Sequence, residues 1–489
     1  MTAEAKAAPP LCTRCKEQDG VLDLRSKAVC QTCFTTFVAS KAIKRLEVLQ
    51  RETRGPRLPS RPQRYMLALS RGPSSTALLH ILSENVRRQR ERNQRVKFEL
   101  VPVFVDVDVD VDVDVDVDIG TDQRKKTTAS SDPVPSAPSE RTAVDADTAT
   151  ATSPSSPNPT STNTNTDAPE QATRPSDAFA THFPEFAIHN VPLSGILSSR
   201  EIDWASLPAQ DASLPPSRRL ADFVSRLPSA TARADVSRLL TRHALFAAAA
   251  ARGCGVVLLG YNTTSLAELT LAEAAKGRGF GIPWLVNDGA FPLPPRAIAD
   301  APAVGAPTDI ISSSSSSSFS SSQTTTNGSS VGIMHIYSPL REIFRKEILT
   351  YLSIISSSAG PLTDLFPSSS STLSSPSSSS SPHTAAVVSH RDLSLDDVVA
   401  RYFVDVEASY PSVVANVVRT TGKLNRTISG GRQCELCGGG LDPLGDERWK
   451  GEIGEADANG SSAVDNENVD VPAGRKSRLC YGCERSVKG

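Results

Sequence analysis

Four pairs of cysteines carry the clearest chemical signal in this sequence. The chain has 489 residues and nine cysteines, of which eight form CxxC pairs: Cys12 and Cys15, Cys30 and Cys33, Cys434 and Cys437, and Cys480 and Cys483. Two thiolates separated by two residues can bind one metal ion from a single turn, and two such pairs complete a tetrahedral four-sulfur site. The order of the pairs therefore predicts two four-cysteine sites.

Zinc is the metal that we assign to both predicted sites. Disulfides are one alternative, but they form in oxidising compartments and the N-terminal residues do not resemble a secretory signal. Iron–sulfur ligation is the other alternative. Because all four ligands of each site are cysteines, no position is left open for a reacting water, and we expect about two structural zinc ions. The ninth cysteine, Cys254, stands in an apolar segment and is interpreted as a buried strand residue.

A second candidate for chemistry is the turn in LALSRGPSSTALL, residues 67–79. An apolar strand, a tight turn and the start of a helix follow one another, as in many α/β proteins that hold a phosphate. Backbone N–H groups at a helix N-terminus attract anions, and glycines in the turn allow close approach. The residues of this turn that could contact an anion are Ser70, Arg71, Gly72, Ser74 and Ser75. With a single glycine, the turn is expected to bind an anion weakly.

The segments around this turn predict an α/β fold with a doubly wound parallel sheet. The expected strands cover residues 65–69, 98–105 and 255–260, and the expected helices begin near Ser74, Ala230 and Thr264. Strands that alternate with helices of these lengths are typical of parallel sheets covered by helices on both faces. The turns at 70–75 and 261–265 should then meet at the carboxyl ends of the strands, where such sheets bind ligands.

Two further helical segments follow this pattern. Residues 335–352 predict a short extended segment and then a helix, on which Glu342 and Lys346 would form an i,i+4 pair. A final helical region ends in Arg419 and Lys423, just before the second set of cysteines.

Three segments have compositions that do not support a folded core. Residues 106–177 begin with a Val-Asp repeat and continue with small polar residues, 296–330 end in a Ser/Thr tract, and 356–385 are mostly serine. Such sequences bury too little apolar surface to offset the entropy of ordering the chain, so we expect disorder. The resulting domain prediction is an N-terminal zinc module (1–40), a basic linker (41–64), an α/β domain (65–355) with inserts at 106–177 and 296–330, a serine-rich linker (356–385), a helical region (386–425) and a C-terminal zinc module (426–489).

Basic residues are concentrated at a few positions. The formal net charge is −2, but the Val-Asp repeat contributes seven aspartates, so the rest of the chain is net positive. Residues 41–64 contain eight Lys or Arg and two Glu, which indicates either a solvated linker or a surface for a polyanion such as nucleic acid. The candidate contacts to nucleic acid are Arg54, Arg57, Arg61, Arg87, Arg88, Arg419 and Lys423.

The sequence contains no apolar run of the roughly 20 residues that would span a bilayer. Together with the missing secretory signal, this predicts a soluble, cytoplasmic protein that does not interact with a membrane.

Several motifs, in this order, resemble the cytoplasmic tRNA 2-thiolation protein 2 family. They are the terminal CxxC pairs with LALSRGPSSTALL, LLGYNTTSLAELTL, YSPLREIFRKEI and SYPSVVANVVRTTGKL between them. The resemblance covers the chain outside the three inserts. It implies a PP-loop fold (adenine nucleotide alpha hydrolase-like) and a role in 2-thiolation of the wobble uridine, forming mcm5s2U, in tRNAs for lysine, glutamate and glutamine. It also implies a heterodimer with a catalytic paralogue that takes sulfur from a thiocarboxylated ubiquitin-like carrier.

The chain departs from the loop of active PP-loop enzymes, which reads S-G-G-x-D-S. Ser70, Gly72 and Ser75 match this pattern, whereas Arg71 replaces a glycine and Ser74 replaces an acidic residue. An arginine disfavours the positive φ that glycine permits, and a serine cannot replace a carboxylate beside magnesium.

Two other features of active relatives are missing. Their second signature resembles G-H-N-A-D-D, and this chain has Gly260, Tyr261, Asn262, Thr263, Thr264 and Ser265, without the histidine or either aspartate. Their catalytic cysteines align with Ala234 and Ser237. The resemblance therefore implies that this chain has no catalytic residue and does not turn over ATP.

The function predicted from these observations is that of a non-catalytic subunit of a tRNA thiolase, which positions tRNA through its basic surface and zinc modules. An ATP-dependent tRNA-modifying enzyme with a degenerate loop is the first alternative. A zinc-ribbon scaffold that binds proteins and not RNA is the second.

Overall fold

The computed structural model describes residues 10–53, 62–94, 96–107, 175–199, 202, 204, 207–208, 211–293, 333–366, 393–426, 433–441 and 479–489. All of them belong to one compact unit formed by Met1–Asp110 and Thr173–Gly489. Most of the predicted insert at 106–177, the insert at 296–330, residues 367–385 of the serine-rich linker, and the candidate RNA contacts Arg54, Arg57 and Arg61 lie outside the described residues. The expected start of that linker at residue 356 is wrong, because 356–365 form a small hairpin and a 3-10 turn whose Leu362 and Leu365 are buried in the core.

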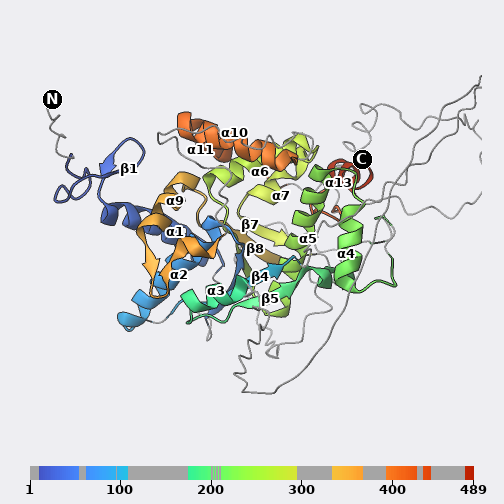
Figure 1. Ribbon diagram of the computed structural model, residues 1–489, viewed down its shortest axis with the longest axis horizontal. Coiled ribbons are helices and arrows are strands. Elements are labelled where there is room, and N and C mark those ends of the chain that lie inside the picture. Colours follow the sequence, from blue (N-terminus) through green and yellow to red (C-terminus); the bar gives the residue numbers. More distant parts are fainter. Residues whose placement is uncertain are drawn as a thin grey trace, which may run out of the picture. The chain divides into compact units, whose positions relative to one another are not determined.

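A six-stranded sheet forms the centre of this unit (Figure 1), in the order β5-β4-β3-β6-β8-β7. Its strands are β3 (Gln63–Leu69), β4 (Phe98–Asp106), β5 (His189–Pro192), β6 (Val256–Leu258), β7 (Gly289–Pro292) and β8 (Ile333–Tyr337). Neighbouring strands run parallel, except that the edge strand β7 runs antiparallel to β8. The predicted parallel sheet is confirmed, with an antiparallel edge that the sequence analysis did not include.

Helices follow the strands in the alternating order that the sequence predicted. They are α1 (Gln31–Thr53), α2 (Pro73–Glu91), α3 (Pro175–His182), α4 (Pro216–Ser225), α5 (Ala230–Ala251), α6 (Thr263–Ala275), α7 (Ile282–Val286), α9 (Arg345–Ile354), α10 (Leu395–Ser409), α11 (Pro411–Thr421) and α13 (Tyr481–Lys488). Short 3-10 turns are η1 (Leu193–Ser198), η3 (Gly279–Gly281) and η4 (Leu362–Leu365), and two small hairpins pair β1 (Leu22–Asp23) with β2 (Ala28–Val29) and β9 (Ser356–Ser357) with β10 (Gly360–Pro361). No helix in the described part of the chain is long and apolar enough to cross a membrane.

Apolar side chains cover both faces of the sheet, because successive residues of a strand point to opposite sides. Tyr65, Leu67 and Leu69 of β3 belong to a core shared with α1, α2 and α9. Met66, on the other face, belongs to a core shared with α4 and α5. This division is the doubly wound arrangement that the sequence predicted.

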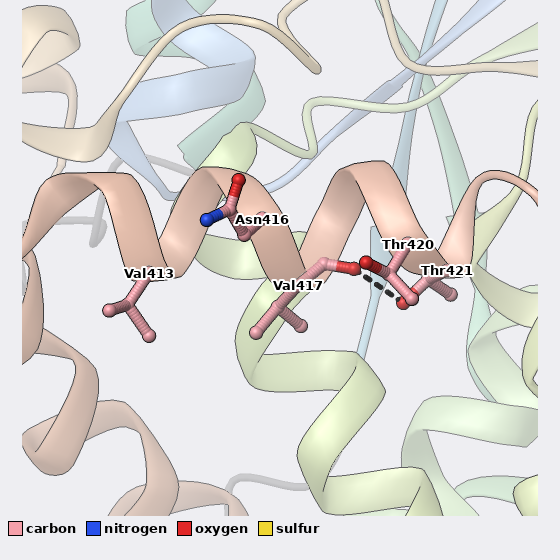
Figure 2. Close-up of a pocket in the computed structure, with 5 residues that line it drawn as sticks. All are labelled: Val413, Asn416, Val417, Thr420 and Thr421. Carbon is pink, nitrogen blue, oxygen red and sulfur yellow. Dashed lines mark hydrogen bonds between the residues drawn. The ribbon is translucent and has the colours of Figure 1, made fainter.

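A third apolar cluster lies between α6, α7, α10 and α11. Figure 1 shows α10 and α11 lying along α6, and both helices contact it. One side of α11 borders a hollow of about 440 Å³ that is lined by Val413, Asn416, Val417, Thr420 and Thr421 (Figure 2). The predicted helical region is therefore a pair of helices packed on α6.

Helix α1 changes the domain boundaries that we expected at the N-terminus. It runs without a break from the second CxxC pair to Thr53, so the expected boundary at residue 40 falls inside a helix. Phe34 and Leu46 of α1 are buried in one core with Leu78 of α2. The cysteine-rich segment thus shares its core with the α/β unit, and residues 41–53 are helix and not linker.

The expected Glu342–Lys346 pair is wrong, because α9 begins only at Arg345 and Glu342 precedes it. The Glu342 carboxylate instead lies 2.8 Å from the Lys41 ammonium of α1, which is 301 residues away in the sequence. Packing of α1 against the segment before α9 therefore replaces the local helical pair.

Candidate functional site

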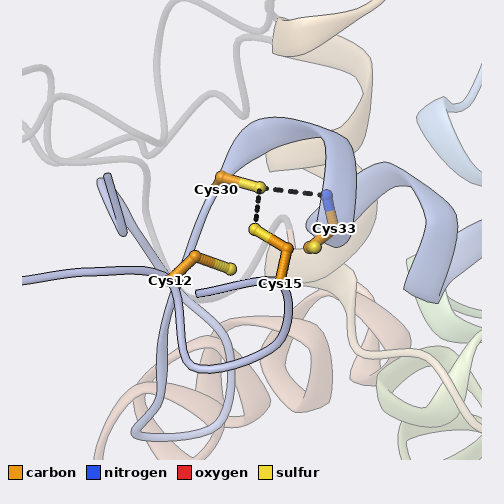
Figure 3. A group of neighbouring side chains, drawn as sticks. All are labelled: Cys12, Cys15, Cys30 and Cys33. Atoms are coloured by element: carbon orange, nitrogen blue, oxygen red, sulfur yellow. Dashed lines mark hydrogen bonds between the residues drawn. The ribbon is translucent and has the colours of Figure 1, made fainter. Parts of the chain in front are cut away.

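The N-terminal cysteines converge from two short segments (Figure 3). Cys12 and Cys15 stand on a turn that precedes the β1–β2 hairpin, and Cys30 and Cys33 stand at the start of α1. The four sulfurs all lie within 4.8 Å of one another, and the Cys15 and Cys30 sulfurs are 3.9 Å apart. Metal–sulfur bonds of about 2.3 Å in a tetrahedron place sulfurs about 3.8 Å apart, so the four ligands fit a single ion.

The C-terminal cysteines form a second set of the same size. Cys434 and Cys437 lie on a turn after α11, and Cys480 and Cys483 lie at the start of α13. The sulfurs again lie within 4.8 Å of one another, with 3.8 Å between those of Cys437 and Cys480. Within the described residues, these two sets are the groups in which three or more potential metal ligands come together. The pairing of the four CxxC motifs that we predicted from their order is therefore present.

Electrostatics inside the N-terminal set favour a bound cation. Burial raises the pKa of Cys12, but hydrogen bonds from nearby backbone N–H groups outweigh this and lower its pKa to about 6. Contact with Cys30, together with burial, raises the pKa of Cys33 to about 12. A thiolate at one position thus disfavours a second one beside it, and four thiolates need a central positive charge.

None of the nine cysteines is disulfide-bonded. Cys254 is 2% exposed, just before β6, and burial raises the pKa of its thiol. This agrees with the expected buried cysteine and not with a reactive thiolate, which needs an exposed, electropositive environment.

The turn after β3 is closed by its own serines. Ser75 is buried, and its hydroxyl accepts from the backbone N–H of Ser70 at 3.2 Å and donates to the Ser70 carbonyl at 2.9 Å. Gly72 has φ −100°, and Arg71 is not among the residues with positive φ. The turn therefore forms without the left-handed conformation that would need glycine at position 71. The Arg71 side chain is exposed.

The predicted meeting of the two turns is confirmed. The side-chain amide of Asn262 donates to the Ser74 hydroxyl at 2.8 Å, and a Cβ on Gly260 would lie 3.0 Å from the backbone of Ser75. Asn262 also caps α6 by accepting from the backbone N–H of Ser265.

Polar residues that replace the acids of the second signature make structural hydrogen bonds. The Thr264 hydroxyl donates to the Glu407 carboxylate of α10 at 2.6 Å and accepts from the backbone N–H of Arg345 at 3.1 Å. Ser265, which replaces the second acid, accepts from the backbone N–H of Asn262 at 2.8 Å, and the neighbouring Thr263 donates to the carbonyl of Arg341 at 2.8 Å. Glu407, which the sequence analysis did not single out, thus ties α10 to this turn.

The positions aligned with catalytic cysteines lie on the first turns of α5. Ala234 is exposed and Ser237 is half-buried. The nearest cysteine on the same helix-to-strand segment is the buried Cys254, which follows the far end of α5. No thiol is therefore available at the aligned positions.

The described candidate RNA contacts lie on two different helices. Arg87 and Arg88 are exposed on α2, where Arg87 pairs with Glu84 at 2.6 Å, and α2 packs against α1 and α9. Arg419, in the last turn of α11, and Lys423, just after this helix, are both exposed. Two other basic residues of 41–64 are engaged, since Lys41 and Arg45 form ion pairs with Glu342 and Asp288.

A buried ionic cluster beside the C-terminal cysteines was missed by the sequence analysis. It contains Asp235 and Arg238 of α5 and Glu273, Lys276 and Arg278 at the end of α6. Desolvation raises the pKa of Glu273, but the neighbouring Arg238 and Arg278 outweigh it, so the pKa falls below its usual value. The i,i+3 spacings within the cluster predict exposed helix pairs, so the sequence holds no signal for burial.

Comparison with known proteins decides the family. The family profile described as Cytoplasmic tRNA 2-thiolation protein 2 matches residues 394–485. A curated relative of that name from Sclerotinia sclerotiorum is 31% identical over 413 residues, which cover 83% of this chain and 80% of the relative. The chain belongs to the cytoplasmic tRNA 2-thiolation protein 2 family.

Membership in the cytoplasmic tRNA 2-thiolation protein 2 family confirms the resemblance that the order of motifs indicated. Another member, from Phaeosphaeria nodorum, is 29% identical over 486 residues, covering 98% of this chain and 95% of that protein. Among solved structures, the U34-tRNA thiolase NcsA from Methanococcus maripaludis with its 4Fe-4S cluster aligns with a TM-score of 0.42 and 11% identity, covering 88% of this chain and 95% of that chain.

Proposed function

We propose that this chain is a non-catalytic subunit of a cytoplasmic tRNA 2-thiolation complex. It forms a heterodimer with a catalytic paralogue that activates the wobble uridine of tRNAs for lysine, glutamate and glutamine. Sulfur comes from a thiocarboxylated ubiquitin-like carrier, which meets the catalytic subunit and contacts this chain only indirectly. Membership in the family supports the thiolation role, and the chemistry of this chain's turns supports the division of labour.

The observation that carries the non-catalytic assignment is the neutral junction between the two turns. Ser74 and Asn262 meet through a hydrogen bond of 2.8 Å, and Thr264 is held by Glu407 and by the backbone of α9. Magnesium binds through carboxylates and substrate phosphates, whereas the two turns themselves offer hydroxyl and amide groups. The nearby carboxylate of Glu407 is buried, and its two oxygens accept from Thr264 and from the backbone N–H of Lys346. With Arg71, the turn can attract an anion such as phosphate. It lacks the carboxylate that would hold magnesium beside that phosphate for a reaction.

We assign a structural role to the two cysteine sets, each with one zinc ion. Thiolate ligands suit zinc, and a closed set of four supplies folding energy and no reactive position. We also assign several basic residues to the phosphate backbone of tRNA, because guanidinium and ammonium groups bind phosphate without reading sequence. They are the exposed residues Arg87, Arg88, Arg419 and Lys423, together with Arg54, Arg57 and Arg61 of the basic segment.

A reconstituted assay tests this proposal. The catalytic paralogue, the activated carrier, ATP and unmodified tRNA are combined with and without this chain, and 2-thiouridine is measured by retardation of tRNA in a mercury-containing gel. Thiolation is expected only when both subunits are present. Ser70→Ala in this chain should retain it, whereas the same change in the loop of the paralogue should abolish it.

Two results would contradict the proposal. Pyrophosphate release from ATP by this chain alone, lost on Ser70→Ala, would support an autonomous enzyme. Full thiolation without this chain would leave a protein-binding scaffold as the remaining interpretation.

A further inference from the structure

Buried charges connect the C-terminal cysteine set to the helices of the α/β unit. Arg278, just after α6, is fully buried, and so are the carboxylates of Asp235 and Glu273. The Arg278 Nε donates to Glu273 at 2.6 Å, and its Nη2 donates to Asp235. A guanidinium without water is stable only when its N–H groups find acceptors. The two carboxylates provide acceptors for one side of the guanidinium.

The other side of the guanidinium faces the cysteines. The Arg278 Nη1 lies 3.7 Å from the sulfur of Cys483 and 3.5 Å from the hydroxyl of Ser486. Within the described residues, these two atoms are the acceptors that the structure gives to Nη1. A neutral thiol is a weak acceptor, whereas a metal-bound thiolate accepts a charge-assisted hydrogen bond. The geometry therefore suits a thiolate at Cys483.

Close packing of the backbone keeps the segment that carries Arg278 next to the turn that carries Cys483. Gly277 has φ +80°, and a Cβ there would lie 2.6 Å from the Tyr481 ring. A Cβ on Gly482 would lie 2.4 Å from Cγ of Arg278 and 2.7 Å from the carbonyl of Lys276. Both glycines therefore allow the segment after α6 to touch the CxxC turn that begins α13.

Ser486 provides a second link between the C-terminal cysteine set and the α/β unit. Its hydroxyl donates to Oδ2 of Asp235 at 2.8 Å, while the other oxygen of Asp235 accepts from Lys276 at 3.0 Å and from Arg278. Helix α13 is thus joined to α5 by a hydrogen bond next to the Arg278–Cys483 contact. Residues of α5, α6 and α13 thus hold the one cluster member, Arg278, that contacts a ligand of the metal site.

We propose that Arg278 is a positioning residue of the C-terminal metal site, where its guanidinium donates to the metal-bound sulfur of Cys483 while Asp235 and Glu273 hold it in place. The inference rests on metal binding by this cysteine set and goes beyond the role proposed for the chain in thiolation. The hydrogen bond disperses negative charge from the metal-bound sulfur and fixes its position, so it slows loss of this ligand. Outer partners of this kind typically change metal affinity by about 10–100-fold.

The experiment compares Arg278→Lys with Arg238→Gln in the full chain. Lysine keeps a positive charge beside both carboxylates but cannot reach them and Cys483 together. Arg238 binds the same two carboxylates, at 3.0 Å in the case of Asp235, but contacts no cysteine in the described structure, so it is the matched control. Zinc transfer to a chromophoric chelator is followed over time, and the N-terminal site serves as an internal reference.

Arg278→Lys is expected to weaken the binding of one of its two ions by about 10–100-fold and to leave the other ion unaffected. Both ions of Arg238→Gln should bind as in the wild type. With cobalt in place of zinc, the sulfur-to-cobalt charge-transfer band should shift in Arg278→Lys alone, because that band reports hydrogen bonds to the ligand sulfur. Unchanged metal release and spectrum in Arg278→Lys, or equal effects in Arg238→Gln, would overturn the inference.

Failure of the metal site itself would look different. A wild-type chain that binds a single ion, which is lost on Cys12→Ser with Cys15→Ser, would refute metal binding by the C-terminal set and this inference with it. The proposed role in thiolation would be unaffected, because it is measured on tRNA. If Arg278→Lys fails to fold, the same comparison made with Ser486→Ala, which removes the second acceptor of Nη1, should shift the cobalt band and leave two ions bound.

Discussion

The amide of Asn262 and the hydroxyl of Ser74 are 2.8 Å apart, although 188 residues separate them in the sequence. Their hydrogen bond joins the turn after β3 to the turn after β6, which lie on adjacent parallel strands. The carboxyl ends of such strands form the usual ligand site of an α/β sheet. In this chain the same place is occupied by a neutral contact between two side chains, so the junction contributes to stability.

A double-mutant cycle measures that contribution. Ser74→Ala, Asn262→Ala and the double variant should show a coupling of about 0.5–1.5 kcal/mol in the free energy of unfolding, which is typical of a neutral hydrogen bond. Asn262→Ala alone should cost about 1 kcal/mol more, because it also removes the cap of α6. Urea denaturation gives all four values. Strictly additive effects would show that the two turns are not coupled.

Metal content is the next expectation. Elemental analysis of the purified chain should find about two zinc ions, and Cys12→Ser with Cys15→Ser should remove one of them. The loss should also destabilise α1, because Cys12 belongs to the same core as Phe34 of that helix. Cys254→Ala, which removes a buried cysteine outside both sets, should keep both ions. Iron instead of zinc would overturn the metal assignment.

The sequence contained enough information for the local and periodic features of the fold. The CxxC spacing predicted both cysteine sets, and the alternation of strands and helices placed the turns of Ser74 and Asn262 together. Contacts between distant segments could not be predicted in this way. Glu342 pairs with Lys41 and not with Lys346, and Arg278 finds its partners on α5 and α13. Such pairs depend on tertiary packing, and a single sequence gives no signal for them.

Binding of tRNA should depend on the exposed basic residues. Arg419→Glu with Lys423→Glu should weaken binding and make the dependence of log K on log salt shallower, by about 0.7–0.9 for each phosphate that the variant no longer neutralises. Reversal of Arg54, Arg57 and Arg61 should act in the same direction. Fluorescence anisotropy at several salt concentrations measures both quantities. Lys488→Glu, a reversal at an exposed residue outside the proposed surface, is the control, and equal weakening there would indicate only a general charge effect.

The stability of the fold should decrease as the pH falls below about 6.5, the ordinary pKa of histidine. Burial lowers the pKa of His80, whose Nδ1 lies 2.9 Å from the Tyr351 hydroxyl. Below about pH 6.5 the unfolded chain therefore takes up a proton that the folded chain resists, and unfolding becomes easier. Because burial also lowers the pKa of His189 and His335, His80→Gln should reduce the slope without removing it. Melting temperatures measured from about pH 7.5 to about pH 5, a range that brackets histidine titration, provide the check.

If the melting temperature of His80→Gln falls with pH as steeply as that of the wild type, His80 is not responsible for the loss of stability. The expected tautomer offers a second check. Burial raises the pKa of Tyr351, so its hydroxyl keeps its proton and donates to Nδ1, and the ring proton of His80 resides on Nε2. Nitrogen chemical shifts of the imidazole distinguish the two tautomers.

Restoring the loop residues that active relatives possess should not restore ATP turnover. Arg71→Gly with Ser74→Asp supplies the missing glycine and carboxylate, and the Asn262 amide can donate to an aspartate as it does to Ser74. The second turn still lacks acids, because Thr264 and Ser265 stand at their positions, and the Thr264 hydroxyl is engaged by Glu407 at 2.6 Å. Positions Ala234 and Ser237 still provide no thiol.

We therefore expect no release of AMP and pyrophosphate above background from this double variant, whereas the catalytic paralogue under the same conditions should release both. The further addition of Thr264→Asp should place a second carboxylate beside Glu407 and destabilise the packing of α6 on α10, because two buried carboxylates repel each other. ATP turnover by the double variant alone would mean that the turn retains a working metal site, and the assignment of this chain as a non-catalytic subunit would then be wrong.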